Sequence, residues 1–407
     1  MHPGAERRRK RISLVLERLI QRGLTPIGVD FGASGAKLMQ LRKSRGVWSV
    51  VGAARVEAPQ GEEDPARCAR MYSEAIAARV EAAGFIGRRC VIGLDNQSVK
   101  VRSVRLPHMA DNDADNALRV DGAARLGLKE VRCEIGWMRA GEVRQGDEVR
   151  DEIILVGATH EHAEHAIEAV SGAGLQPMAC EPSFVACARA MGWRHRRQSD
   201  QRHVRIVIDI GAKSSGVMVL RGDSLAFYKQ LEWGGARLDE AAAKRLSLDV
   251  GTAEEIRRQR MRPESDAGAP ADGVDPLVDR AIFDAVRPLL TELAQEATLC
   301  VRYYMVTFRG ERPESIQLVG GNAGEPRLCD AVKDVTGIDT FVGNPFDGFN
   351  TTDATFIGGD RRGYLTQWAG AAGLCLRLED NTRARALRAE SAAPAAEAPT
   401  QHTRGAA

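Results

Sequence analysis

The sequence predicts a two-lobed α/β fold in which a ligand binds between the lobes, and three observations support this. The chain has 407 residues, of which 43% are apolar, and this length and composition suit two lobes of similar size. One apolar segment with an Asp-x-Gly-Ala core occurs twice along the chain. A third segment, closer to the carboxyl end, reads as a strand that ends in Gly320-Gly321.

The internal repeat indicates that the two lobes are related. Residues 27–42 align without a gap onto residues 206–221, and seven of the sixteen positions are identical. Each copy is followed by a turn and a second β-rich run, at residues 47–56 and 225–231. Duplication of one lobe is the simplest explanation, and the polar segment 194–205 is expected to link the two halves.

Each copy of the repeat predicts a β-hairpin whose tip binds phosphate. Asp30 and Asp209 would stand at strand ends, where a carboxylate can reach a cation, and the glycines at 32 and 211 let the backbone approach a ligand closely. Small residues then leave backbone N–H groups and hydroxyls free for phosphate oxygens: Ala33, Ser34, Ala212, Ser214 and Ser215. A dinucleotide-binding loop would instead open into a helix with a G-x-G-x-x-G pattern.

Two such hairpins on corresponding halves could hold a polyphosphate between them. Asp30 and Asp209 are then expected to share one Mg²⁺ through water, because magnesium keeps much of its hydration shell. Lys37 is expected beside the β- and γ-phosphates, and Gly320-Gly321 would let a base or ribose lie against the backbone. The predicted cofactors are therefore ATP and Mg²⁺, and a duplicated scaffold that has lost its ligand is the alternative.

Composition limits the other classes of function. Lys and Arg number 57 against 55 Asp and Glu, and a net charge of +2 argues against a dedicated nucleic-acid binder. The eight cysteines are scattered without a C-x-x-C pair, which predicts free thiols in a reducing compartment. No stretch approaches the roughly 18 apolar residues of a membrane span, and the amino-terminal run does not fit a secretory signal. A cytoplasmic location is expected.

The flanking segments differ from the rest of the chain. Residues 1–23 form a basic prefix with apolar residues at helical spacing, which could make a peripheral membrane contact, bind a partner or pack on its own domain. Residues 379–407 are rich in Ala, Arg, Glu and Pro and are expected to be disordered. The segment 263–276 is predicted to be a flexible loop.

Two hairpin phosphate loops followed by a strand-Gly-Gly element are the arrangement of the actin, sugar-kinase and heat-shock-chaperone superfamily. Within it, residues 25–378 resemble the type IV pilus assembly protein PilM family, relatives of the cell-division protein FtsA. The resemblance also rests on short motifs in this order: Ser103–Pro107, Ile154–Ala158, Ala173–Pro177 with Glu181-Pro182, Gly234-Gly235 with Leu238, Arg302–Tyr304 and Asn344–Phe346.

The resemblance implies an α/β, actin-like (ribonuclease H-type) fold. Residues 24–203 would form the first lobe, with a small α+β subdomain inserted at about 103–178, and residues 204–378 would form the second lobe. Within the insertion, residues 111–130 depart from the family's more aromatic, Pro-containing stretch.

The resemblance also assigns site residues by position. They are Asp30, Gly32, Ala33, Ser34 and Lys37 in the first phosphate motif, Asp209, Gly211, Ala212, Ser214 and Ser215 in the second, and Gly320, Gly321 and Asn322 in the adenosine motif. A Glu and a Lys that flank the nucleotide in the family correspond to Glu254 and Arg257. Arginine keeps the charge of lysine but changes its reach and geometry.

The function implied is an ATP- and Mg²⁺-binding adaptor at the cytoplasmic face of the inner membrane, in a pilus, secretion or competence platform. Its partner would be the N-terminal segment of a PilN-like membrane protein. Hydrolysis is expected to be slow at most, since no carboxylate stands out as a general base. The alternatives are an FtsA-like, membrane-associated filament former and a sugar-kinase-type enzyme, for which neither a catalytic Asp nor a sugar-binding insertion is evident.

Overall fold

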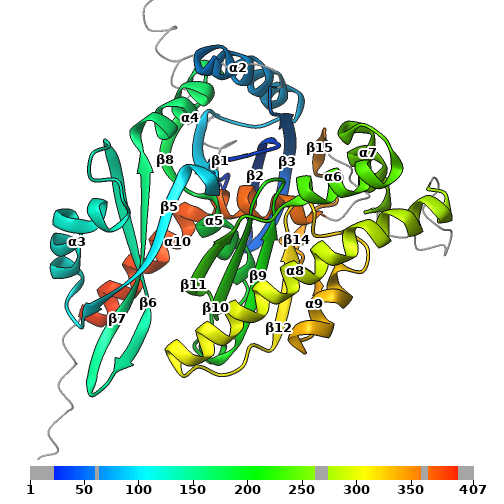
Figure 1. The fold of residues 1–407 in the computed structure, drawn as a ribbon. Coiled ribbons are helices and arrows are strands. Elements are labelled where there is room, and N and C mark those ends of the chain that lie inside the picture. Colours follow the sequence, from blue (N-terminus) through cyan, green and yellow to red (C-terminus); the bar gives the residue numbers. More distant parts are fainter. Residues whose placement is uncertain (1–22, 60–63, 262–273, 359–364, 393–407) are drawn as a thin grey trace, which may run out of the picture.

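The computed structural model describes residues 23–59, 64–261, 274–358 and 365–392. The strands of these residues form three sheets, two at the centre of the molecule and a smaller one at its side, on the left of Figure 1. The two central sheets follow one strand pattern, and this pattern positions the candidate site.

The first central sheet is built around two hairpin strands and their parallel neighbours. Its strands are β1 (Ile27–Gly32), β2 (Gly35–Ser44), β3 (Val47–Glu57), β4 (Arg89–Leu94), β8 (Gln176–Pro182), β14 (Phe349–Asn350) and β15 (Thr355–Ile357). The order is β14-β3-β2-β1-β4-β8, and β15 also pairs with β3. The β1–β2 and β2–β3 pairs are antiparallel, whereas β1–β4 and β4–β8 are parallel.

The second central sheet repeats this pattern. Its strands are β9 (Val204–Ile210), β10 (Ser215–Arg221), β11 (Ser224–Leu231), β12 (Ser315–Val319) and β13 (Thr340–Val342). The order β11-β10-β9-β12-β13 has antiparallel pairs on one side of β9 and parallel pairs on the other. It corresponds strand for strand to β3-β2-β1-β4-β8. The two copies confirm the predicted two-lobe, actin-like fold.

The third sheet is the predicted α+β insertion. It consists of β5 (Val99–Pro107), β6 (Cys133–Gln145) and β7 (Glu148–Thr159), with α3 (Asp111–Arg125) packed on it. Leu118 of α3 is buried with Leu106 and Leu155 of the sheet. The insertion ends before residue 178, because the next helix, α4 (His160–Gly172), packs on α2 (Pro65–Ala82) and β8 pairs with β4.

The helices cover the sheets and join the lobes. Besides α2 to α4, they are α5 (Ser183–Gly192), α6 (Gly235–Leu246), α7 (Val250–Arg260), α8 (Pro276–Phe308), α9 (Leu328–Thr336) and α10 (Ala369–Ala392). Helix α5 contacts both central sheets, and its Phe184 stacks on Tyr228 of β11 with ring centroids 3.8 Å apart. None of the described helices combines the length and apolar character that crossing a bilayer requires.

The carboxyl end of the chain differs from the prediction in two respects. Strands β14 and β15 pair with β3, so part of the segment expected in the second lobe joins the first sheet. Helix α10 continues to Ala392, so the disorder expected from residue 379 is wrong as far as that residue. Alanine, leucine and arginine favour helix, and buried Leu374 and Leu376 anchor its start. Residues 1–22 of the predicted basic prefix 1–23 and residues 393–407 lie outside the described residues.

Candidate functional site

The tips of the two hairpins face one cleft of about 760 Å³ that residues of both lobes line. The β1–β2 tip packs tightly because Gly35 has φ +131°, and a Cβ there would lie 2.1 Å from the carbonyl oxygen of Val56. The β9–β10 tip is closed by a hydrogen bond of 3.1 Å from the amide of Gly211 to the carbonyl oxygen of Ser214. The repeat in the sequence therefore corresponds to two walls of one cavity.

The wall formed by the first sheet carries a row of charged residues. Asp30 on β1 is paired in register with Lys37 on β2, and Lys37 is paired with Arg55 on β3. All three residues line the cleft. This row combines a carboxylate, which can face a metal ion, with cations that can face phosphate oxygens.

Among the described residues, four aspartates line the same cleft. Asp239 of α6 is paired with Arg257, and the other three are Asp30, Asp95 and Asp209. Burial raises the pKa of each of these three carboxyls, and in all three Lys37 acts in the opposite direction. For Asp209 the pKa rises to about 6, and Asp30 and Asp95 contribute to this rise. Asp30 also accepts a hydrogen bond from the hydroxyl of Ser183. Partly or fully buried carboxylates that repel one another are a suitable donor set for a hard divalent cation, which would favour their charged forms.

The third predicted motif completes the cleft from the second lobe. Strand β12 is followed directly by Gly320, where φ is +94° and a Cβ would lie 2.4 Å from Oδ1 of Asp209. Asn322 Nδ2 donates a hydrogen bond of 3.1 Å to the carbonyl oxygen of Gly211, which ties this motif to the second hairpin tip. Thr366 Oγ1 donates to the Gly320 carbonyl oxygen at 2.8 Å. The glycine loop is therefore held beside the second aspartate.

Most of the predicted site residues line this cleft, and two do not. Those that do are Asp30, Gly32, Ala33, Ser34, Lys37, Asp209, Gly211, Ala212, Ser214, Glu254, Gly320, Gly321 and Asn322. Ser215 is buried, and its hydroxyl donates a hydrogen bond of 2.6 Å to the carbonyl oxygen of Trp233. Its predicted contact with phosphate is therefore replaced by a structural one.

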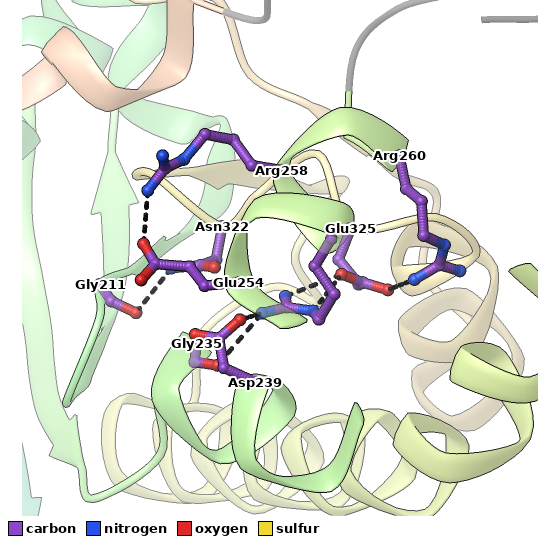
Figure 2. Close-up of polar contacts among 9 residues, drawn as sticks. Gly211, Gly235, Asp239, Glu254, Arg258, Arg260, Asn322 and Glu325 are labelled. Atoms are coloured by element: carbon purple, nitrogen blue, oxygen red, sulfur yellow. Dashed lines mark hydrogen bonds and ion pairs between the residues drawn. The ribbon is translucent and has the colours of Figure 1, made fainter. Parts of the chain in front are cut away.

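Arg257 is the second exception. It is 1% exposed, and its guanidinium donates to the carboxylates of Asp239 and Glu325. The neighbouring Arg258 lines the cleft instead and pairs with Glu254. Figure 2 shows this pair pointing away from Glu325 and Asp239. The prediction that Arg257 faces the ligand is therefore wrong, because its side chain satisfies buried carboxylates in the lobe interior.

Several residues that line the cleft are missing from the prediction, notably Arg55, Asp95, Ser183 and Arg258. Asp95 directly follows β4, which runs parallel to β1, so both strands deliver an aspartate to one edge of the sheet. Only the strand order would have shown this. Arg55 and Ser183 lie outside any glycine motif, and they reach the cleft through pairing and packing.

Comparisons with known proteins place this geometry in a family. The sequence model of the type IV pilus assembly protein PilM matches residues 28–379. The chain is similar to a solved structure described as the PilM-PilN type IV pilus biogenesis complex, with 23% identity over 87% of this chain and 98% of that one and a TM-score of 0.69. It is also similar to the ethanolamine utilization protein EutJ from Carboxydothermus hydrogenoformans, with 15% identity, 87% and 89% coverage and a TM-score of 0.50.

At these identities the solved structures establish a shared fold. The family match adds more, because it spans both central sheets, the inserted sheet and every motif that lines the cleft. This chain belongs to the type IV pilus assembly protein PilM family.

Proposed function

We propose that the chain is an ATP- and Mg²⁺-binding adaptor of a type IV pilus, or of a related secretion or DNA-uptake platform, at the cytoplasmic face of the inner membrane. The observation that carries the nucleotide part is the convergence of two related hairpin tips, three aspartates and a row of cations on one cleft. Family membership supports the role in pilus assembly.

Asp30 and Asp209 would hold the magnesium ion, through water molecules of its shell, with Asp95 adding negative charge nearby. The bound ion would supply positive charge to the phosphate oxygens. Lys37 would donate to the same oxygens, as would the free backbone amides of the hairpin tips. The raised pKa of Asp209 supports this assignment, because a cation in the cleft would favour the carboxylate form.

The adenosine end would lie against the second lobe. Gly320 and Gly321 present bare backbone to the cleft, and Glu254 with Arg258 forms a charged pair at the same wall. A carboxylate there is suited to accept hydrogen bonds from ribose hydroxyls. The nucleotide would thus contact both lobes and favour their closed arrangement. We expect hydrolysis to be slow at most.

The proposed partner is the N-terminal segment of a PilN-like membrane protein. The similar solved structure is described as a complex of PilM with PilN, and this chain covers 98% of the matched chain. The inserted sheet beside the first lobe offers a second body against which a peptide could be gripped (Figure 1). A nucleotide that closes the lobes would then bias peptide binding.

The nucleotide claim is tested by titrating fluorescent ATP with and without Mg²⁺ into the wild type, Asp30→Asn and Asp209→Asn. We expect tight, magnesium-dependent binding by the wild type and a loss of magnesium dependence in both variants. Asp147→Asn, at an exposed position between β6 and β7, is the matched control. Binding that is unaffected by both cleft substitutions would remove the nucleotide claim.

The partner claim is tested with a labelled peptide of the cytoplasmic N-terminal segment of the PilN-like protein from the same cell. Fluorescence anisotropy should show binding that strengthens with MgATP. A peptide that binds in neither state, while nucleotide still binds, would remove the adaptor role and keep the nucleotide site.

A further inference from the structure

Arg55 lies directly beside Lys37 on the neighbouring strand. The register pairs Asp30 with Lys37 and Lys37 with Arg55, so the three form one row across β1, β2 and β3. Residues directly opposite on adjacent strands project from the same face of a sheet. All three line the cleft, and the row therefore continues from the proposed metal carboxylate through one cation to a second.

The guanidinium of Arg55 has no partner within the described part of the chain: it makes neither a hydrogen bond nor an ion pair there. The arginine on the opposite wall differs, because Arg258 pairs with Glu254 and Glu255. Burial lowers the pKa of Arg55, and repulsion by Arg258 across the cleft lowers it further. Glu57 and Glu254 offset this only in part.

Such an arrangement is unfavourable in an empty cleft. Lys37 and Arg55 are like charges directly opposite each other on neighbouring strands, and such pairs repel. The corresponding row of the second lobe, Asp209, Gly216 and Gln230, contains no cation. The fold therefore does not need two cations at these positions. An anion with several charges, bound between the walls of the cleft, would offset the repulsion of Arg55 by Lys37 and by Arg258.

We propose that Arg55 is a phosphate-binding residue of the nucleotide site and acts beside Lys37 on the phosphate chain. The proposal rests on the function proposed above, and it adds a residue that none of the phosphate and adenosine motifs contains. The planar guanidinium offers several N–H donors in a geometry that matches phosphate oxygens. A protein carboxylate is the weaker explanation, since Glu254 is already paired with Arg258.

The experiment compares Arg55→Gln, Arg55→Lys and the wild type by isothermal titration with MgATP, and by thermal unfolding without nucleotide. We expect Arg55→Gln to bind MgATP about tenfold more weakly, the effect of losing charged hydrogen bonds. Arg55→Lys should recover part of the loss. The melting temperature of empty Arg55→Gln should equal or exceed that of the wild type, because a repelled, desolvated charge is gone. Arg144→Gln removes an exposed cation of β6 outside the cleft and is the control with the same charge change.

The outcomes separate the two proposals. If the wild type binds no nucleotide, the proposed function fails. If the wild type binds and Arg55→Gln binds equally well, only the role of Arg55 fails. A weaker affinity together with a lower melting temperature of the empty variant would show a structural role and overturn the inference. So would a lysine variant that binds as poorly as the glutamine variant.

Discussion

The two lobes share one strand order but use their charges differently. In the first sheet, the row that crosses β1, β2 and β3 is Asp30, Lys37 and Arg55, whereas the equivalent row of the second sheet is Asp209, Gly216 and Gln230. The aspartate is the only residue that the two rows have in common. Gly216 packs against the ring of Tyr228, so a Cβ there would lie 3.0 Å from the ring. Within these rows, the cations that would contact phosphate belong to the first lobe, whereas the second lobe places Lys213 and Arg258 on the cleft from other positions.

The second lobe uses two arginines of α7 in its interior. Arg257 and Arg260 of α7 both bind Glu325, which follows the glycine loop of β12, and Arg257 also binds Asp239 of α6 (Figure 2). These contacts fix two helices and the loop to one another. Both lobes therefore present charge to the cleft, but among the described residues only the second uses a buried arginine cluster to hold a wall of the cleft in place.

The largest expected effect tests this structural use of charge. Arg257→Met would leave the buried carboxylate of Asp239 without its partner and remove one of the two arginines that bind Glu325, and breaking such a buried pair typically costs about 3–5 kcal/mol of unfolding free energy. Arg258→Met, one residue along the same helix, removes a half-exposed pair and should cost about 0.5 kcal/mol or less. Urea unfolding measures both. Equal losses would contradict the division between the two arginines.

The second-largest expected effect concerns Asp209 and the pH dependence of stability. The pKa of Asp209 rises from 3.8 to about 6 in the folded chain. The folded state therefore holds a proton that the unfolded state releases, and stability falls as pH rises from about 4 to about 6. A difference of about two pH units corresponds to about 3 kcal/mol. Asp209→Asn cannot ionise, so it should stabilise the nucleotide-free protein by up to this amount at pH 7.5.

Thermal or urea unfolding at pH 7.5 and pH 4 checks this prediction, since the gain should disappear at the lower pH. A gain of the same size at both values would show that the substitution acts by packing instead. MgATP binding by the wild type near pH 6 should also release protons, which calorimetry in buffers of different ionisation enthalpy would detect.

The third-largest expected effect tests directly whether the two rows differ in their contribution to MgATP binding. Lys37→Met removes the cation next to Asp30, and loss of one or two charged hydrogen bonds predicts about 100-fold weaker MgATP binding. Gln230→Met in the second lobe row should change the affinity by less than about twofold, within the spread of ordinary surface substitutions. Fluorescent ATP titration compares the two. Similar losses in both variants would mean that the lobes contribute equally.

The smallest effect lies where the lobes touch. The hydroxyl of Tyr228 is buried without a hydrogen-bond partner among the described residues, while its ring stacks on Phe184. Tyr228→Phe keeps the stacking and removes an unsatisfied polar group, so stability should rise by up to about 1 kcal/mol. Nucleotide affinity should stay within about twofold. A clear loss of affinity would instead assign the hydroxyl a contact with ligand.

The sequence was sufficient for the features that glycine motifs mark. The repeat predicted both hairpins, the two aspartates of the cleft and the fold. The apolar run that ends in two glycines predicted β12 and the position of Gly320. A helix with three arginines at 257, 258 and 260 offers no such signal. Which of them is buried depends on Glu325, which is distant in sequence. Arg55 and Asp95 likewise reach the cleft only once the strand order is known.

The end of the chain was harder to predict for a related reason. Composition favoured disorder after Leu378, but Arg189 of α5 binds Asp380 at 3.1 Å and Lys43 of β2 binds Glu379 at 2.8 Å. These partners come from distant segments of the first lobe. Local composition does not reveal them, so a helix of good intrinsic propensity was mistaken for a tail.

Helix α10 lies near the end of the chain but packs on the first sheet, and this determines the order in which the two lobes can fold during synthesis. The core that contains Met39 and Trp48 is completed by Trp368, Ala371 and Leu376, which are synthesised after the whole second sheet. Domains usually fold as their residues emerge, amino-terminal part first. Here the second lobe has all its strands before the first lobe is complete. The first lobe leaves one apolar face uncovered until α10 has been synthesised. Nascent chains should therefore engage a chaperone through the first lobe until α10 arrives.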